Sequence, residues 1–251
     1  MGPGNDALPL LYEFPFSHFS EKARWVLDYC GQRYRSRPQF PGLHLLPMRL
    51  LSGQTSLPVL VCGPRPIPGS SRILRLVSRL SGEAELLGPP ELRREARHWM
   101  DYLDQEIGVH MRRALLHRQL RDRAYMLRVF GMGRTGIERS LLGFGYPAFV
   151  QAYRNFYDMN DSTARDSEQH FQKALTRLEE HIKSRRYLVG DRFGLADLTL
   201  GALLSPLTCV PEQPFPWPRC EDPYLTALYE HPVVQHARFL YRAHRHRTKA
   251  P

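Results

Sequence analysis

A short apolar run that ends at a proline and leads directly into a helix constrains the fold of this chain more than any other feature. The run covers residues 10–14 and stops at Pro15. Apolar residues then recur at i, i+3, i+4 and i+7, which predicts an α-helix with one buried face. These residues are Ala23, Val26, Leu27 and Cys30, and Gly31 follows at the position of a helix stop. The sequence therefore predicts a strand that feeds a helix through a Pro-x-Ser turn.

Two serines, Ser17 and Ser20, lie at the entry of this predicted helix. Serine hydroxyls cap the free backbone N–H groups of a helix N-terminus, and the helix dipole favours negative charge there. A turn of this kind is a place to hold an anion or a thiolate. We therefore interpret the turn as a binding site as well as a structural element.

Composition limits the class of protein. The chain has 251 residues, of which 42% are hydrophobic and 24% charged, as is typical of a soluble globular protein with one large or two small domains. No run approaches the roughly 20 apolar residues of a membrane span, and the first residues lack the basic and apolar regions of a signal peptide. The four cysteines (Cys30, Cys62, Cys209 and Cys220) show no metal-ligand or Cys-x-x-Cys spacing. We expect a reduced, cytoplasmic protein without a metal.

The formal charge of +10 is concentrated in two segments. Residues 112–139 contain eight arginines and two acidic residues, and residues 231–251 contain five basic residues and no acidic one. We interpret these segments as a solvated helix face and a loose terminus. The alternatives are an anionic substrate or a nucleic acid, but no aromatic-interleaved binding motif accompanies the arginines, which makes nucleic acid the less favoured partner.

The first part of the chain alternates between short strands and helices. Strands are predicted at 33–39, 57–62 and 65–68, and helices at 43–51 and 70–80, in addition to the first strand and helix. This order predicts a small α/β domain over residues 8–82.

A Gly- and Pro-containing linker at 82–90 separates this domain from a second, all-helical domain predicted over residues 91–247. Its expected helices cover residues 91–120, 146–157, 162–183 and 195–207, with two more between 223 and 247 and a proline-rich loop at 211–218. The segment 195–207 is apolar nearly all round, which indicates a helix buried at the centre of its domain.

Two further motifs each allow two interpretations, and a third is a folding signal. Pro58, after Leu57, marks either an edge strand with a trans proline or a cis proline that offers the strand edge to a ligand. Ser70, between Gly69 and Ser71, is either a plain N-cap or part of a carboxylate site at a helix N-terminus. Residues 187–200 contain the late folding signal of a capping box, with Gly194 and Asp197 in its two positions.

Together these segments resemble the motifs of the cytosolic glutathione transferases of the bacterial type, with serine at the thiol-activating position. They are SHFSEKAR at 17–24, LPVL at 57–60, GSSRI at 69–73 and GDRFGLAD at 190–197. The resemblance covers nearly the whole chain. It implies a thioredoxin-like N-terminal domain followed by an all-helical C-terminal domain, and a homodimer.

The resemblance also implies specific roles. Ser17 would donate its hydroxyl hydrogen to the sulfur of glutathione, the co-substrate. The backbone of Leu57, beside cis-Pro58, would pair with the cysteinyl part of the tripeptide, and Ser70, with Ser71 behind it, would hold the γ-glutamyl carboxylate. A helix N-terminus lowers the pKa of a thiol from about 8.5, and the thiolate is the attacking species.

A pocket for the second substrate is expected where a C-terminal helix faces the cleft. Its expected lining is Phe16 beside the turn, with Tyr102, Ile107, His110 and Met111 from the helix. Packing between helices is the alternative for each of the helical residues.

The chain departs from the family pattern at four positions. His18 replaces a frequent proline, Gly69 replaces an acidic residue that meets the α-amino group of the tripeptide, and Gly194 replaces the capping serine. Serine at both 17 and 20 excludes disulfide exchange by this turn. Thiol addition remains open.

We expect an enzyme of detoxification that adds glutathione to a hydrophobic electrophile or isomerises one. The alternative is a non-catalytic binding protein of the same fold that carries a hydrophobic or anionic ligand such as a tetrapyrrole. Gly69, the surplus arginines and three histidines (His98, His110 and His117) suggest that alternative.

Overall fold

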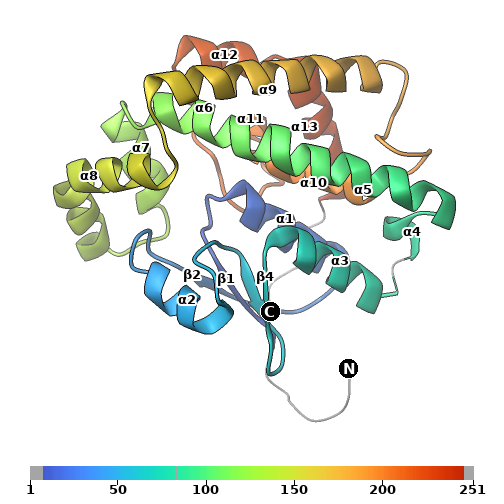
Figure 1. Ribbon diagram of the computed structural model, residues 1–251, viewed down its shortest axis with the longest axis horizontal. Coiled ribbons are helices and arrows are strands. Elements are labelled where there is room, and N and C mark those ends of the chain that lie inside the picture. Colours follow the sequence, from blue (N-terminus) through green and yellow to red (C-terminus); the bar gives the residue numbers. More distant parts are fainter. Residues whose placement is uncertain (1–7, 83, 246–251) are drawn as a thin grey trace.

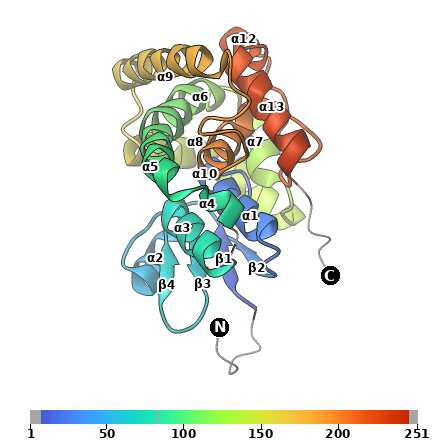
Figure 2. The same cartoon turned by 90° about the vertical axis from the view of Figure 1, so that its right-hand side faces the viewer.

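The computed structural model describes residues 8–82 and 84–245. Figures 1 and 2 show the sheet and its helices on one side of the molecule and a larger group of helices on the other. Residues 1–7 lie outside the described residues, as do Arg247 and Lys249, two of the basic residues of the segment 231–251. The two layers meet along the helix that follows the first strand.

The sheet contains four strands in the order β2-β1-β3-β4. They are β1 (Leu10–Glu13), β2 (Arg35–Pro38), β3 (Val59–Val61) and β4 (Pro66–Pro68). β1 runs parallel to β2, with Leu11 opposite Ser36, and antiparallel to β3, with Leu11 opposite Leu60; β3 and β4 are antiparallel. The two prolines of β4 lie on an edge strand, where a missing backbone N–H is tolerated.

Three helices accompany the sheet: α1 (His18–Tyr29), α2 (Leu45–Ser52) and α3 (Ser70–Leu80). The strand and helix order predicted from the sequence is confirmed, as is the thioredoxin-like class. α1 begins as expected, since the Ser17 side chain accepts a hydrogen bond from the backbone N–H of Ser20 at 3.3 Å. The helix ends before Gly31, which has a φ of +60°.

The remaining described residues are almost entirely helical, as predicted. The elements are α4 (Ala84–Leu87), η1 (Pro90–Leu92), α5 (Arg93–Tyr102), η2 (Leu103–Val109), α6 (His110–Gln119), α7 (Arg123–Gly131), α8 (Gly136–Phe156), α9 (Asp161–Ile182), α10 (Leu195–Leu203), α11 (Ser205–Thr208), α12 (Pro223–Tyr229) and α13 (Pro232–His244). No helix among residues 8–82 and 84–245 is long and apolar enough to cross a bilayer.

Two parts of the helical domain differ from the prediction. The helix expected over 91–120 is interrupted by η2, a π-helical segment that changes the register between α5 and α6. α7 and the first half of α8 were not predicted, because the glycines between 131 and 145 are typical of a loop. α8 begins at Gly136 because Thr135 and Glu138 form a capping box.

The buried helix predicted near residue 195 is confirmed, since every residue of α10 is buried. The Asp197 carboxylate accepts hydrogen bonds from the backbone N–H groups of Gly194 at 3.1 Å and Leu188 at 2.8 Å, which fixes the start of this helix. α10 packs against α1 so closely that a Cβ on Gly201 would lie 2.7 Å from the Trp25 ring. Only glycine allows this contact.

Charged residues of α1 are buried because the helix is covered from both sides. Glu21 is 2% exposed and accepts hydrogen bonds from Arg24 at 2.9 Å and from Arg245 at 2.9 Å. Arg24 also pairs with Glu13, and Arg245 with Asp28. Burial alone would raise the pKa of Glu21, but Arg245 and Arg24 hold it below the usual value. The carboxylate is therefore charged inside the protein.

This cluster corrects in part the interpretation of the basic segments as solvated, because some of their arginines are exposed, such as Arg121, Arg123 and Arg128, and others are not. Arg245, from the end of the chain, is 3% exposed, and Arg238 is 7% exposed and donates to the Thr208 carbonyl at 2.9 Å. In the other segment, Arg134 donates to the Gln39 carbonyl at 2.9 Å. These arginines are structural, because guanidinium groups satisfy several acceptors at once where secondary structure elements meet.

We expect Glu21→Gln to lower the free energy of unfolding by about 1.5 to 3 kcal/mol, because it removes the charge of a buried acceptor that Arg24 and Arg245 share, while each arginine keeps its other carboxylate partner. Urea denaturation followed by circular dichroism measures the change. Asp191→Asn is the control, since its ion pair with Arg192 is exposed and contributes little. Equal stability of the two variants would show that the buried cluster does not hold α1 in place.

Candidate functional site

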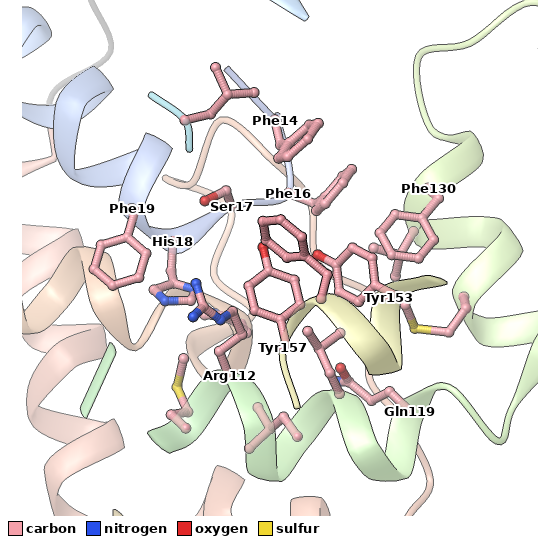
Figure 3. A pocket seen from close by; sticks show the side chains of 18 of the residues that line it. Phe14, Phe16, Ser17, His18, Phe19, Arg112, Gln119, Phe130, Tyr153 and Tyr157 are labelled. Atoms are coloured by element: carbon pink, nitrogen blue, oxygen red, sulfur yellow. The ribbon is translucent and has the colours of Figure 1, made fainter. Parts of the chain in front are cut away.

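A cavity of about 210 Å³ lies where the turn before α1 meets the helical domain. Figure 3 shows its walls, with the turn on one side and α6 on the other. The turn contributes Phe14, Phe16, Ser17, His18 and Phe19; α6 contributes Met111, Arg112, Leu115, Leu116 and Gln119; α7 and α8 contribute Met126, Val129, Phe130, Tyr153 and Phe156. The other lining residues are His44, Thr55, Ser56, Leu57, Tyr157, Pro206 and Trp217.

Ser17 is placed at the mouth of this cavity by the end of β1. Its backbone N–H donates to the Phe14 carbonyl at 2.9 Å, which fixes the turn, and its half-buried side chain lines the cavity. Two other hydroxyls near the turn do not reach the cavity. Ser20 is fully buried, and the Tyr12 hydroxyl accepts a hydrogen bond from Arg37 at 3.3 Å instead. Of these three, Ser17 alone is available to a ligand.

The loop before β3 lies beside the same turn, and Leu57 lines the cavity. The Leu57–Pro58 peptide bond is cis, which excludes the interpretation of this motif as an edge strand with a trans proline. The Pro58 carbonyl accepts a hydrogen bond from the backbone N–H of Gly69 at 2.9 Å. This bond brings the start of α3, and with it the buried Ser70, next to the cis-proline loop.

Gly69 precedes α3 with a φ of +87°, in the left-handed region that favours glycine. Nothing lies within 4 Å of a Cβ built at this position, so there is room for a side chain and only the backbone conformation opposes one. The family pattern that the sequence resembles has an acidic residue at this position. The chain therefore lacks a carboxylate beside Ser70 on this loop.

Ser71 has a structural role that the sequence did not reveal. Its hydroxyl accepts a hydrogen bond from the Lys22 ammonium at 2.7 Å and donates to Asp104. Lys22 is fully buried and also pairs with Asp104, at 2.5 Å. Burial lowers the pKa of Lys22, and Asp104 opposes that shift. Ser71 therefore links α3 to α1 and η2, and its hydroxyl already has Lys22 and Asp104 as hydrogen-bond partners.

Aromatic rings form the cavity wall beyond the turn. Phe16 stacks on Phe14, with ring centroids 5.3 Å apart, and meets Phe130 edge to face at 4.6 Å. The Phe16 and Met111 predictions agree with this cavity, because both side chains line it. The aromatic residues of α7 and α8 were missed, although the density of Phe and Tyr between 144 and 157 was a signal for an apolar wall.

Tyr102, Ile107 and His110 do not line this cavity, which corrects the predicted pocket. Ile107 is fully buried in the core. Tyr102 contacts Trp99 and Arg177, and His110 contacts Ser167 and His170 of α9. Tyr102 lies before the π-helical turn and Ile107 within it, whereas His110 follows it, where the turn has changed the register of α6 relative to α5.

His18 and Arg112 meet across the cavity from opposite domains, as Figure 3 shows. The His18 Nε2–H donates to the Gly108 carbonyl at 3.0 Å. Burial, reinforced by the charge of Arg112, lowers the pKa of His18 to about 3. His18 is therefore a neutral hydrogen-bond donor, and the guanidinium of Arg112 stacks on Tyr157 with 4.3 Å to the ring centroid.

One group of side chains in the described part of the chain has the composition of a metal site. Ligand atoms of Glu106, His110 and His170 lie within 4.8 Å of one another. The Glu106 carboxylate is 3.1 Å from His170 Nδ1 and 4.0 Å from His110 Nε2. Two ligands of one zinc ion lie roughly 3.4 Å apart, as bond lengths of about 2.1 Å require, so the group would have to contract to bind a metal.

The fold and the site define a class of protein: a thioredoxin-like domain joined to an all-helical domain, with a cavity between them that opens on the first helix N-terminus. Residues 11–85 match the family model described as glutathione S-transferase, N-terminal domain, and residues 145–231 match the one described as glutathione S-transferase, C-terminal domain. The chain belongs to the glutathione S-transferase superfamily.

Individual relatives agree with this assignment. The chain is 25% identical over 205 residues to glutathione S-transferase TCHQD of Arabidopsis thaliana, covering 79% of this chain and 76% of that protein. Its fold is similar to a glutathione S-transferase of Xanthobacter autotrophicus Py2 (TM-score 0.64, 16% identity, 94% and 93% coverage). It is also similar to a theta class enzyme of Xanthomonas axonopodis pv. citri with glutathione bound (TM-score 0.57, 19% identity, 92% and 97% coverage).

We expect His18 to make the protein less stable in acid. Because its pKa is about 3 in the folded state and near 6.5 when unfolded, the unfolded chain binds a proton first as the pH falls below 6.5. As the pH decreases from 6 to 4, the free energy of unfolding of the parent protein should fall relative to that of His18→Gln by up to about 1.4 kcal/mol per pH unit. His98→Gln, at an exposed histidine, is the control. Parallel pH profiles for the protein and His18→Gln would contradict the prediction.

Proposed function

We propose that the protein is a glutathione-dependent transferase in which Ser17 activates the thiol for attack on a hydrophobic electrophile. The observation that carries the proposal is the position of Ser17, at the N-terminus of α1 and in the wall of an apolar cavity. The family assignment supports glutathione as the thiol, and the same turn in the sequence resembles the family's thiol-activating motif.

The chemistry follows from the helix N-terminus. The Ser17 O–H donates a hydrogen bond to the sulfur, and the dipole of α1 favours the negative thiolate over the neutral thiol. The thiol proton passes to solvent. The thiolate then attacks the electrophilic carbon, a C–S bond forms, and either a leaving group departs with its electron pair or the adduct takes up a proton.

The rest of the tripeptide would lie along the first domain. The backbone of Leu57 beside cis-Pro58 would pair with the cysteinyl part, and Ser70 at the start of α3 would hold the γ-glutamyl carboxylate. Ser71 acts from behind, through Lys22 and Asp104, and holds the start of α3 in place. The aromatic wall of Phe16 and Phe130 would accommodate the electrophile.

We also propose a homodimer in the cytoplasm. The dimer rests on the family resemblance alone. The cytoplasmic location is supported by the cysteines Cys62, Cys209 and Cys220, which are free thiols.

We expect Ser17→Ala to lower kcat/KM about a hundredfold, since the variant loses the hydrogen bond to the reacting sulfur. Initial rates with glutathione and an activated aryl chloride measure the loss. Because Ala also removes the helix cap, thermal unfolding of each variant is followed in parallel.

Two controls accompany this experiment. Ser17→Thr keeps a hydroxyl and a cap, and Ser20→Ala changes a serine that does not reach the cavity. Both should retain most of the activity. Unchanged kinetics of Ser17→Ala would remove the assigned role, and no turnover by the parent protein would favour the non-catalytic binding protein.

We expect reduced glutathione to bind with a Kd in the micromolar to low millimolar range, and Ser70→Ala to weaken this binding about tenfold or more. The loss of one hydrogen bond to a charged group corresponds to roughly 1.5 to 3 kcal/mol. Isothermal titration calorimetry measures both proteins. Ser78→Ala is the matched control, because Ser78 is buried on the same helix and bonds only to backbone carbonyls at 2.8 and 3.3 Å. Equal affinities for all three proteins would exclude Ser70 from the site.

A further inference from the structure

Among the described residues that line the cavity, Arg112 is the only charged group. The described lining contains no aspartate, glutamate or lysine. Its two histidines, His18 and His44, both have a pKa below the usual value because they are buried, so they are neutral near pH 7. The cavity is otherwise apolar and aromatic. A single positive charge therefore dominates its electrostatics.

The guanidinium of Arg112 has aromatic neighbours and, among the described residues, no carboxylate partner. Its Cζ lies 4.3 Å from the Tyr157 ring centroid and 5.8 Å from that of Phe19. Other arginines of the same helical region are paired: Arg118 donates to Glu168 at 2.9 Å, and Arg113 donates to the Tyr157 carbonyl at 3.2 Å. The stack on Tyr157 fixes the plane of the guanidinium and leaves its N–H donors for a ligand.

This arrangement favours an anion. A charge beside an apolar wall is poorly solvated, and an oppositely charged ligand recovers that free energy when it enters. Guanidinium groups bind carboxylates through two parallel N–H···O bonds, a geometry that a flat aromatic acid can adopt while its ring lies against phenylalanine. Ser17, on the opposite side of the cavity, faces the same space.

We propose that the second substrate is an aromatic electrophile that carries an ionised carboxylate, which pairs with Arg112 while the ring packs against the wall formed by Phe16 and Phe130. The proposal rests on the proposed function. The reacting carbon would then lie between the anion held by α6 and the thiolate held by Ser17. In a substitution reaction the thiolate forms the C–S bond and chloride leaves with the electron pair of the C–Cl bond.

Two other uses of the charge give a different pattern. If Arg112 stabilised the thiolate, or the charge that develops on any electrophile, its loss would slow neutral and acidic substrates alike. If the arginine only packed on Tyr157, its loss would not discriminate between them. A matched pair of ligands that differ by one carboxylate separates the proposal from both alternatives.

The first experiment measures binding and needs no catalysis. The probes are 3,5-dinitrobenzoate and 1,3-dinitrobenzene, followed by quenching of tryptophan fluorescence, since Trp217 lines the cavity. The parent protein should bind the carboxylate at least about tenfold more tightly than the neutral compound, as expected for a charged hydrogen-bonded pair. Arg112→Gln should abolish this preference and leave the affinity for the neutral probe within about twofold.

Arg177→Gln is the matched control. Arg177 stacks on Tyr102 with the same 4.3 Å from Cζ to the ring centroid, but it does not line the cavity. It should keep the full preference for the carboxylate. Equal binding of the two probes by the parent protein, or an unchanged preference in Arg112→Gln, would overturn the proposal.

The second experiment compares turnover of 4-chloro-3,5-dinitrobenzoate and 2-chloro-1,3-dinitrobenzene with glutathione. Arg112→Gln should lower the ratio of their kcat/KM values about tenfold or more, whereas an equal loss with both substrates would overturn the proposal. Absence of turnover with either substrate would count against the proposed function. The binding experiment would still decide the role of Arg112.

Discussion

Buried charge pairs on α1 hold the two domains together, and the site depends on them. Glu21 binds Arg245 from the end of α13, and Lys22 binds Asp104 from η2, so one helix of the first domain carries opposite charges into the second. Removing Asp104 would leave the fully buried Lys22 without this carboxylate partner, which is far more costly than losing an exposed pair. The hydrogen bond from His18 to the Gly108 carbonyl adds a third link beside the cavity. These links fix α1, and with it the turn that carries Ser17.

The cavity is therefore a product of the interface and belongs to neither domain alone. The first domain supplies Ser17 and Leu57, and the helical domain supplies Arg112 and the aromatic wall. A thiol held at the end of α1 and a second ligand held on α6 can meet only because both elements are fixed against each other. This division agrees with the family's separation of a thiol-binding domain from a substrate-binding domain.

Much of the first domain could be predicted from the sequence, because its signals are local. The apolar spacing after Pro15, the Ser17 cap and the stop at Gly31 all act within a few residues of one another. Other features of the site were out of reach. Helical periodicity placed His110 on the cavity face, but the π-helical turn changed the register of α6 relative to α5, and nothing in the local pattern indicates where such a turn occurs. Glycines near residue 140 concealed the first half of α8, although the capping box of Thr135 and Glu138 marks its start.

By itself, the sequence determined the order of strands and helices, the capped turn at Ser17 and the late capping box at Asp197, since each depends on hydrogen bonds and spacing within a short segment. Only the tertiary structure decided which polar residues are buried and which side chains face the ligand. Glu21, Lys22 and Arg245 have the composition of a solvated surface, yet they lie in the interior because their partners come from distant parts of the chain. Arg112 differs from its neighbouring arginines for the same reason: what surrounds a charge depends on which elements pack around it.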